Sequence, residues 1–267
     1  MARRATFIQQ EREAADGPLL VLDAGNALFG YWPSMESEGT IMVEAMNAMG
    51  YDAMALGAYD LYLGLEILAR RMADASFPML SANLENSEGE LIAPSHVVIE
   101  RDGVTFGIIG LTQPDVMKLR GVEKLVDVKD PATAARPLVD ALRDEVDVLL
   151  VLSHIGFDED LALAANVGGI DIIIGGNTRR LMQVPQRVGD TVIVQQGYAG
   201  EWIGRLRVTY DAKWKIIGAT ESLVTLDETF PDDPELKTMR DAWAERWPSP
   251  TPEPSPTPTP LPTQAGA

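Results

Sequence analysis

Short apolar runs alternate with amphipathic stretches along most of this chain. Residues 19–22 are apolar throughout and predict a buried strand that runs into a turn at 23–26. After them, apolar side chains recur at helical spacing, and Gly50 is placed to end that helix. The apolar face consists of Ile41, Met42, Ala45, Met46 and Met49. Its methionines are interpreted as core packing rather than as a metal or cofactor site.

The same reading extends to the end of the folded part. Further strands are predicted at residues 53–56, 97–99, 105–109, 148–152, 170–174, 191–195, 206–210 and 215–224. Further helices are predicted at residues 65–73, 132–143, 158–167 and 235–247, and hairpin turns at 101–103 and 211–213. An early half that alternates strand and helix, followed by a strand-rich part, indicates an α/β fold. It has either one mixed sheet or two packed sheets with helices outside.

Polar, glycine-bearing loops follow the predicted strands. They lie at residues 23–26, 57–60, 153–156 and 176–179, with Asn83 after another apolar run. Sites in α/β proteins form at the carboxyl ends of strands, so a site on this chain is expected where these loops meet.

Composition narrows the function. The chain has 267 residues, 46% hydrophobic and 23% charged, with a net charge of −18 and a pI near 4.4. Such an acidic surface repels phosphate backbones and disfavours nucleic-acid binding. The absence of cysteine excludes disulfides, iron–sulfur clusters, thiolate zinc sites and a cysteine nucleophile. Two histidines, His96 and His154, are few for a transition-metal enzyme, and His96 is interpreted as structural.

The ends differ from the body. Every even position from Pro248 to Pro262 is proline, which predicts an extended, disordered linker over 248–267. We therefore expect a domain over 1–230, a short helix within 231–247 and this tail. No apolar run is long enough to span a bilayer, and the basic start has no apolar stretch behind it, so it is not a signal peptide as written.

Several motifs in order resemble the bacterial 5′-nucleotidase/UDP-sugar hydrolase family, within the calcineurin-like metallophosphoesterases. They are Ala-Arg-Arg-Ala-Thr at 2–6, Leu-Asp-Ala-Gly at 22–25, Met-Asn-Ala-Met-Gly-Tyr-Asp-Ala at 46–53, Phe-Pro-Met-Leu-Ser-Ala-Asn at 77–83, Leu-Ser-His-Ile-Gly at 152–156, and Gly-Ile-Asp through Gly-Gly at 169–176. The resemblance implies a four-layer metallophosphoesterase sandwich, with two packed mixed β-sheets flanked by helices. Together with the tail, it suggests a periplasmic or cell-surface location.

The resemblance also implies two divalent metals (Mn, Zn, Fe or Ca) that clamp a phosphoryl group. This chain departs from the family at most of the ligand positions. Asn26 stands at the bridging aspartate, Ala58-Tyr59-Asp60 at the Asn-His-Glu/Asp motif, and Asn177-Thr178-Arg179 at the terminal His-x-His. Only His154 matches a metal-ligating histidine. Residues 2–4 match the region just after the family's first strand and its Asp-x-His, so a partner supplying that edge strand is expected.

Each candidate residue keeps a second interpretation. His154 is a metal ligand or a polar residue satisfied at a strand end. Arg179 and Arg180 contact an oxyanion or are surface arginines. Asn26, Asn83 and Asn177 line a residual polar cleft or serve as turn residues. Asp23 is interpreted as a turn residue, and Asp158, Glu159 and Asp160 as helix-capping residues.

Three functional hypotheses follow. The first is a catalytically impaired domain with a binding or structural role, which holds no metal tightly and takes a nucleotide or other phosphate-bearing small molecule. The second is a divergent active phosphoesterase with an unorthodox metal-ligand set of Asn26, Asp60, His154 and Asn177. Its catalytic candidates are Asp60 and Arg179, and the residual metal positions are His154, Asn26 and Asn177. The third is a surface-displayed structural module.

Overall fold

The computed structural model of the chain describes residues 1–30, 32–118, 121–198 and 200–248. Its α-helices are α1 (Ala2–Ala14), α2 (Trp32–Glu36), α3 (Thr40–Met49), α4 (Leu65–Asp74), α5 (Pro131–Leu142), α6 (Phe157–Asn166) and α7 (Pro234–Arg246), with short 3₁₀ turns η1 (Ala58–Leu61) and η2 (Pro114–Lys118). Its strands are β1 (Leu22–Asp23), β2 (Ala53–Ala55), β3 (Met79–Leu80), β4 (Leu84–Asn86), β5 (His96–Arg101), β6 (Val104–Thr112), β7 (Val126–Val128), β8 (Val148–His154), β9 (Ile172–Gly175), β10 (Gln186–Val188), β11 (Thr191–Gln195), β12 (Trp202–Tyr210) and β13 (Ile216–Thr225).

Two main sheets carry the fold. One has six strands in the order β10-β11-β9-β8-β6-β5, with parallel pairing from β11 through β6 and an antiparallel strand at each edge. The other has three parallel strands in the order β1-β2-β3. Two antiparallel pairs, β12-β13 and β4-β7, complete the set. Parallel strands need crossovers, and α5 and α6 supply two of them, joining β6 to β8 and β8 to β9.

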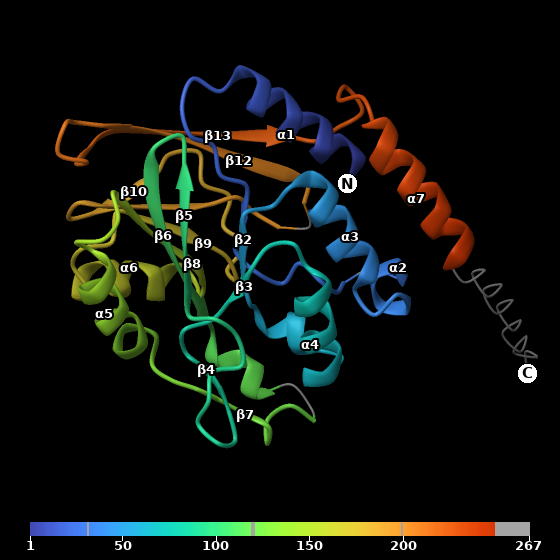
Figure 1. Ribbon diagram of the computed structural model, residues 1–267, viewed down its shortest axis with the longest axis horizontal. Coiled ribbons are helices and arrows are strands. Elements are labelled where there is room, and N and C mark those ends of the chain that lie inside the picture. The colour runs from blue at the N-terminus through green and yellow to red at the C-terminus, as the bar shows by residue number, and fades with distance from the viewer. Residues whose placement is uncertain (31, 119–120, 199, 249–267) are drawn as a thin grey trace, which may run out of the picture.

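Three buried clusters separate four layers. In the first, α1, α3, α4 and α7 pack on one face of the three-stranded sheet. In the second, Ala53, Ala55 and Leu80 on its other face meet β6, β8, β9 and β11. In the third, the far face of the six-stranded sheet packs against α5 and α6. Figure 1 shows the two helix groups on opposite sides of the strands. The α/β fold class with packed sheets flanked by helices is confirmed.

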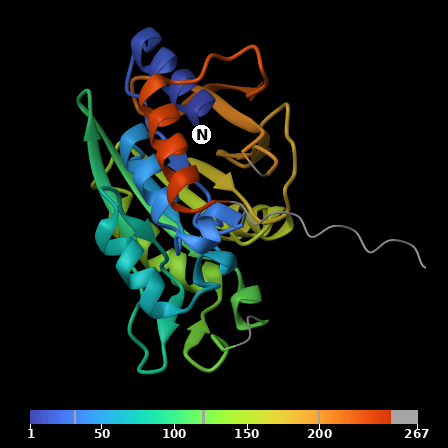
Figure 2. The same ribbon diagram turned by 90° about the vertical axis from the view of Figure 1, so that its right-hand side faces the viewer.

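The predicted C-terminal helix packs onto the body. In α7 the side chains of Leu236 and Trp243 are buried in the first cluster, and Trp247 packs against it. The Trp243 Nε1 donates to Glu44 Oε2 at 2.7 Å, which satisfies the indole inside the contact. Figures 1 and 2 show α7 beside α1 and α3. The proline-rich tail, apart from Pro248, lies outside the described residues.

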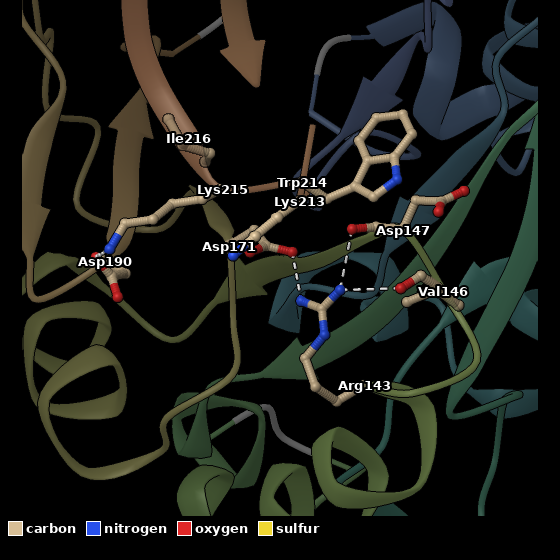
Figure 3. Close-up of a pocket in the computed structure, with 9 residues that line it drawn as sticks. All are labelled: Arg143, Val146, Asp147, Asp171, Asp190, Lys213, Trp214, Lys215 and Ile216. Atoms are coloured by element: carbon tan, nitrogen blue, oxygen red, sulfur yellow. Dashed lines mark hydrogen bonds and ion pairs between the residues drawn. The ribbon is translucent and has the colours of Figure 1, made fainter. Parts of the chain in front are cut away.

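Acidic residues fasten the starts of the parallel strands. Asp171 Oδ2 accepts the Leu149 N–H at 2.7 Å and pairs with Arg143, while Asp147 Oδ2 accepts the Thr105 N–H at 2.8 Å. Arg143, Asp147 and Asp171 line a cavity of about 420 Å³ under the β12–β13 turn (Figure 3). Because it lies at the amino ends of the strands, this cavity is opposite the predicted site.

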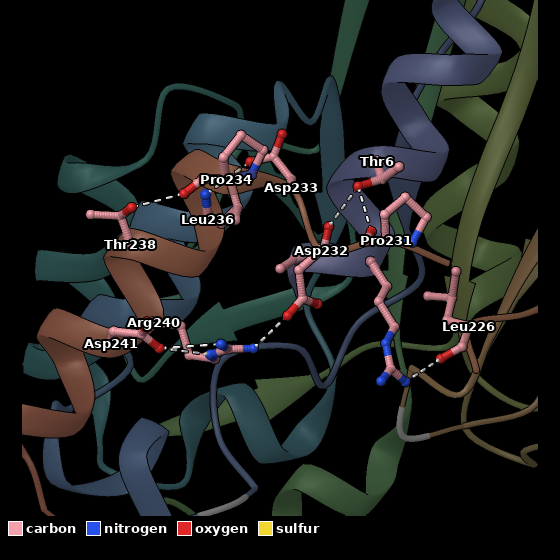
Figure 4. A network of polar contacts seen from close by, with 12 residues as sticks. Thr6, Leu226, Pro231, Asp232, Asp233, Pro234, Leu236, Thr238, Arg240 and Asp241 are labelled. Atoms are coloured by element: carbon pink, nitrogen blue, oxygen red, sulfur yellow. Dashed lines mark hydrogen bonds and ion pairs between the residues drawn. The ribbon is translucent and has the colours of Figure 1, made fainter. Parts of the chain in front are cut away.

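Helix α1 was not among the predicted elements. Its large buried side chains are Phe7 and Ile8, too few for a periodic apolar signal. Tertiary bonds hold it instead: Thr6 Oγ1 donates to the Pro231 carbonyl at 2.8 Å and Arg3 to the Leu226 carbonyl at 3.2 Å (Figure 4). Such long-range bonds leave no trace in local sequence.

Other differences from prediction are small. The strand expected over 19–22 is limited to β1, which pairs with β2 alone among the described residues. The helix ending at Gly50 is confirmed, with that glycine at φ 65°. In the described ranges no helix has the length and apolarity that crossing a membrane requires.

Candidate functional site

The loops after β1, β2, β8 and β9 meet at the carboxyl edge of the two main sheets. His154 at the end of β8 lies against the glycines that follow the other strands. A methyl group built on Gly57 would lie 2.8 Å from its ring, and one on Gly176 would lie 2.7 Å from its Nδ1. A methyl on Gly25 would lie 2.9 Å from the same nitrogen. The structure thus brings the loops carrying Asn26, Asp60, His154 and Asn177 together, because only glycine lets them approach the imidazole so closely.

The carboxylate of Asp60 faces the protein interior and connects the loops after β1 and β2 at this edge. The residue is fully buried in the 3₁₀ turn η1. Its Oδ2 accepts the N–H of Asn26 at 2.7 Å and of Gly57 at 2.8 Å, and its Oδ1 accepts the N–H of Leu28 at 3.0 Å. Burial raises the pKa of Asp60 to about 7, and the three N–H donors oppose that rise. Asp60 therefore joins two loops, and its fully buried carboxylate presents no exposed oxygen to a substrate.

Asn26 also turns its side chain to the protein. Its Oδ1 accepts the backbone N–H of Tyr59 at 2.8 Å. The residue has φ 61°, a left-handed conformation that asparagine tolerates better than most residues. The side-chain oxygen that the resemblance assigns to the bridging position is thus already bonded to the η1 turn.

His154 is buried, with 3% of its surface exposed. Its Nδ1 lies 2.5 Å from the Ala24 carbonyl oxygen, which fixes Nδ1 as the protonated nitrogen of the neutral ring. Its Nε2 is buried and has no hydrogen-bond partner. Burial lowers the pKa of His154 to about 4, so the ring is neutral at physiological pH. Each interpretation of His154 has one observation in its favour. The bond of Nδ1 to the backbone supports a structural role, and the free lone pair of Nε2 supports a role as ligand.

The loop after β9 is held by a buried acid that was assigned differently from the sequence. Asp160 was expected to cap α6, but Gly156 is the N-cap and Asp160 is fully buried. Its carboxylate bonds Ser153 Oγ and, at 3.2 Å, Gln195 Nε2. Gln195 Oε1 accepts Thr178 Oγ1 at 2.9 Å. Asp158 and Glu159 are exposed in the first turn of α6, but the helix has no side-chain capping hydrogen bond, so the capping interpretation is wrong for them as well. The sequence signal for this burial is that Asp160 lies three and four positions before Leu163 and Ala164, on the same buried face of α6.

Asn177 and Arg179 occupy this loop with φ 65° and φ 56°. With Asn26 they make three of the six non-glycine residues of positive φ in the described chain. Backbone strain of this kind gathers at functional sites and supports a site at this edge. The Asn177 amide points toward the Ile155 carbonyl at 3.5 Å, and Arg179 lies over the Tyr198 ring at 5.2 Å. Arg180 instead covers the ring of buried Phe157 at 4.0 Å.

Asn83 does not line this edge, contrary to the cleft interpretation. Its side chain is fully buried and bonds the Thr112 backbone on both sides at 2.8 Å, and the Lys129 carbonyl at 3.1 Å. Asp23 accepts the Gly25 N–H at 2.9 Å, which agrees with its turn role. His96 lies 2.9 Å from Ser95 Oγ at the start of β5.

These residues do not fit a two-metal centre. Two dications a few ångströms apart need an anionic bridge and several oxygen or imidazole ligands. Asp60 is occupied by three N–H groups, Asn26 is neutral and bonded to Tyr59, and His154 offers one nitrogen. Within the ranges that the structure describes, no three histidine, aspartate or glutamate side chains gather as a metal site would require.

Comparisons with known proteins agree with the fold. No family model matches the chain. A curated 5′-nucleotidase of Bos taurus is 31% identical over 91% of this chain and 46% of its own length. The crystal structure of a 5′-nucleotidase precursor from Thermus thermophilus superposes with a TM-score of 0.84 at 28% identity, covering 92% of this chain and 53% of that one.

The calcineurin-like phosphoesterase YfkN from Bacillus subtilis, at 22% identity, superposes with a TM-score of 0.79 over 92% of this chain and 88% of that one, which concerns the fold alone. The chain spans about half the length of the curated 5′-nucleotidases it matches. Over the part that aligns, it belongs to the 5′-nucleotidase family and has the fold of that family's calcineurin-like metallophosphoesterase domain.

Proposed function

We propose that this chain is a catalytically impaired metallophosphoesterase-fold domain that binds a phosphate-bearing small molecule at the strand-end edge. The observation that carries the proposal is the inward orientation of Asp60. Its three backbone N–H bonds occupy the carboxylate at the position where the family's motif meets the metals. Asn26 stands at the position that the resemblance assigns to the bridging aspartate, and in the part of the chain that the structure describes no group of acidic and histidine side chains could hold a metal instead. Two-metal activation of water therefore lacks its anionic ligands.

Anion binding at this edge is supported by Arg179. Its guanidinium lies over the Tyr198 ring and has no hydrogen-bond or ion-pair partner among the described residues. A guanidinium presents a planar fork of donors that matches phosphate oxygens. On a protein of net charge −18, an exposed unpaired arginine beside a polar edge gives local attraction for an anion.

Metal content and hydrolysis test the proposal together. Purified protein without chelator should contain far less than two equivalents of Mn, Zn, Fe or Ca per chain. Nucleoside monophosphates and aryl phosphates should show no turnover with added Mn²⁺ or Zn²⁺, while inorganic phosphate should bind and lose affinity in Arg179→Ala. Two tightly bound metals per chain would overturn the impaired-site proposal.

A divergent active enzyme is the second candidate, and the free Nε2 of His154 is the observation that favours it. Comparing the wild type with His154→Ala and with the combined variant Asn26→Asp, Ala58→Asn, Tyr59→His, Asn177→His separates the two. Wild-type turnover abolished by His154→Ala would establish the enzyme. Turnover in the combined variant alone would establish that ligand loss impaired the site.

The free edge of β1 supports a further, separate proposal of strand addition. Only β2 pairs with β1 in the described structure, and exposed backbone groups at a sheet edge accept another strand. The Val21 N–H already donates to Asp52 Oδ2 at 2.7 Å, so it is excluded from the test. Hydrogen exchange tests the remaining edge: the amides of Leu20 and Leu22 should exchange rapidly in the isolated chain and become protected when a strand partner is present.

A further inference from the structure

Two tyrosines stack on each other beside the candidate site. Tyr59 and Tyr62 have ring centroids 6.3 Å apart and an interplanar angle of 24°. About half of each residue is exposed, 51% for Tyr59 and 52% for Tyr62. A single exposed aromatic residue is ordinary, but two in contact form a flat apolar surface that water covers poorly.

A rigid turn presents this surface. In η1 the neighbours Ala58, Asp60 and Leu61 are buried, so the turn is anchored while Tyr59 faces out. The Tyr59 N–H is held by Asn26 Oδ1, and the three bonds of Asp60 fix the same turn to the loop after β1. A ring on an anchored turn is already ordered, so it loses little conformational entropy when a ligand binds. Its contacts with the ligand therefore contribute more of their free energy to affinity.

The surface adjoins the polar edge directly. Asn26, which holds the Tyr59 backbone, lies next to Gly57, and Gly57 lies against the His154 ring. A third tyrosine, Tyr198, is 52% exposed beneath Arg179. Its loop is joined to the loop after β9 by the bond from the Gly197 N–H to the Arg180 carbonyl at 2.9 Å. The η1 turn of Tyr59 and the loop of Arg179 therefore both adjoin His154, through Gly57 and Gly176.

We propose that Tyr59 and Tyr62 form a stacking platform for the planar ring of a phosphate-bearing ligand. This inference rests on the proposed phosphate binding and names the ligand class: a phosphate ester of an aromatic or heteroaromatic group. Stacking is indifferent to the hydrogen-bond pattern of the ring, so the platform selects for a flat ring rather than for a particular base.

Calorimetric titration with two probes tests the platform on the full chain. Phenyl phosphate carries the ring and the anion, whereas inorganic phosphate carries the anion alone. A stacked ring contributes enough that phenyl phosphate should bind about tenfold more tightly than inorganic phosphate. Tyr59→Ala should remove that tenfold preference and leave inorganic phosphate binding unchanged. Tyr59→Phe should keep the preference, because it keeps the ring.

Trp214→Ala is the matched control, since Trp214 is a partly exposed aromatic residue in the β12–β13 turn at the opposite edge. It should leave both affinities unchanged. Equal binding of the two probes, with no effect of Tyr59→Ala, would overturn the platform and leave the proposed phosphate binding intact. Failure of both probes to bind would overturn the proposed function itself. Self-association that disappears in Tyr59→Ala would assign the rings to a protein interface and overturn the platform.

Discussion

The Oδ1 of Asn26 accepts the backbone N–H of Tyr59 at 2.8 Å. This bond joins the loop after β1 to the turn after β2. It uses the side-chain oxygen of the residue that the sequence resemblance assigns to the family's bridging carboxylate. Asn26 therefore has a structural role at the site edge.

Replacing Asn26 should separate that bond from backbone strain. Asn26→Ala loses the acceptor and puts a residue that tolerates the left-handed conformation less well than asparagine at φ 61°, so we expect a loss of about 1–2 kcal/mol in unfolding free energy. Asn26→Gly loses the acceptor but accepts φ 61° without strain, and it should cost less. Urea unfolding of the three proteins gives the comparison. Equal losses in the two variants would mean that strain contributes nothing.

The sequence predicted the strand-end loops but not the direction of their side chains. Convergence follows from topology, because apolar runs ending in Asp23–Asn26, Gly57–Asp60 and Ser153–Gly156 reach the same edge once the strands are parallel. Whether Asp60 faces a ligand or the backbone depends on three N–H groups, two of them from the distant residues Asn26 and Leu28. Local pattern carries no information on such contacts.

The roles predicted from sequence for two buried polar residues were also wrong. Asp160 in the first turn of α6 has the sequence signature of a cap, and only its packing against Ser153 and Gln195 shows its different role. Asn83 likewise follows a strand as site residues do, yet it bonds the backbone of Thr112 and Lys129 inside the protein. In contrast, α3 was predicted to the residue at its end, because Gly50 and the apolar face are both local signals.

Gly57→Ala should damage the site without any change in backbone preference. Gly57 has φ −103°, which alanine adopts freely, so its effect is steric. The added methyl would overlap Asn26 Oδ1 and lie 2.8 Å from the His154 ring. Overpacking of this kind costs about 1–3 kcal/mol.

Gly168→Ala is the control, since nothing lies within 4 Å of its added methyl. It should change the thermal midpoint little. A Gly57→Ala protein as stable as the Gly168→Ala protein would contradict the close approach of these loops.

Asp60 should behave as a structural acid in unfolding experiments. Asp60→Ala leaves three backbone N–H groups without their buried acceptor. We therefore expect the unfolding free energy to fall by roughly 3–5 kcal/mol. Asp60→Asn should lose less, because one amide oxygen can still accept from Asn26 and Gly57. The exposed Asp140→Ala provides the baseline, expected within about 0.5 kcal/mol of wild type. The reverse order, with Asp140→Ala the more damaging, is the result that the structure forbids.

The buried carboxyl of Glu221 should make the unfolding free energy depend on pH. Its side chain lies on β13 opposite Leu206 of β12, is 7% exposed, and has both carboxylate oxygens buried without a hydrogen-bond partner. Burial raises the pKa of Glu221 to about 7. A carboxyl whose folded pKa exceeds its unfolded value stabilises the protein while protonated, and that contribution is lost as the pH rises through about 7. Stability should therefore fall between about pH 5 and pH 8.

Glu221→Gln keeps the shape and removes the ionisation, so its unfolding free energy should exceed that of wild type at pH 8 by on the order of 1–3 kcal/mol. At pH 5 the two proteins should nearly coincide, because the wild-type carboxyl is then protonated. Glu228→Gln, at an exposed position, serves as the matched control and should follow wild type at both pH values. Urea unfolding at pH 5, 6, 7 and 8 measures the curves. If Glu221→Gln and wild type stayed parallel across that range, the carboxyl would be ionised at a normal pKa, and its burial without a partner would be wrong.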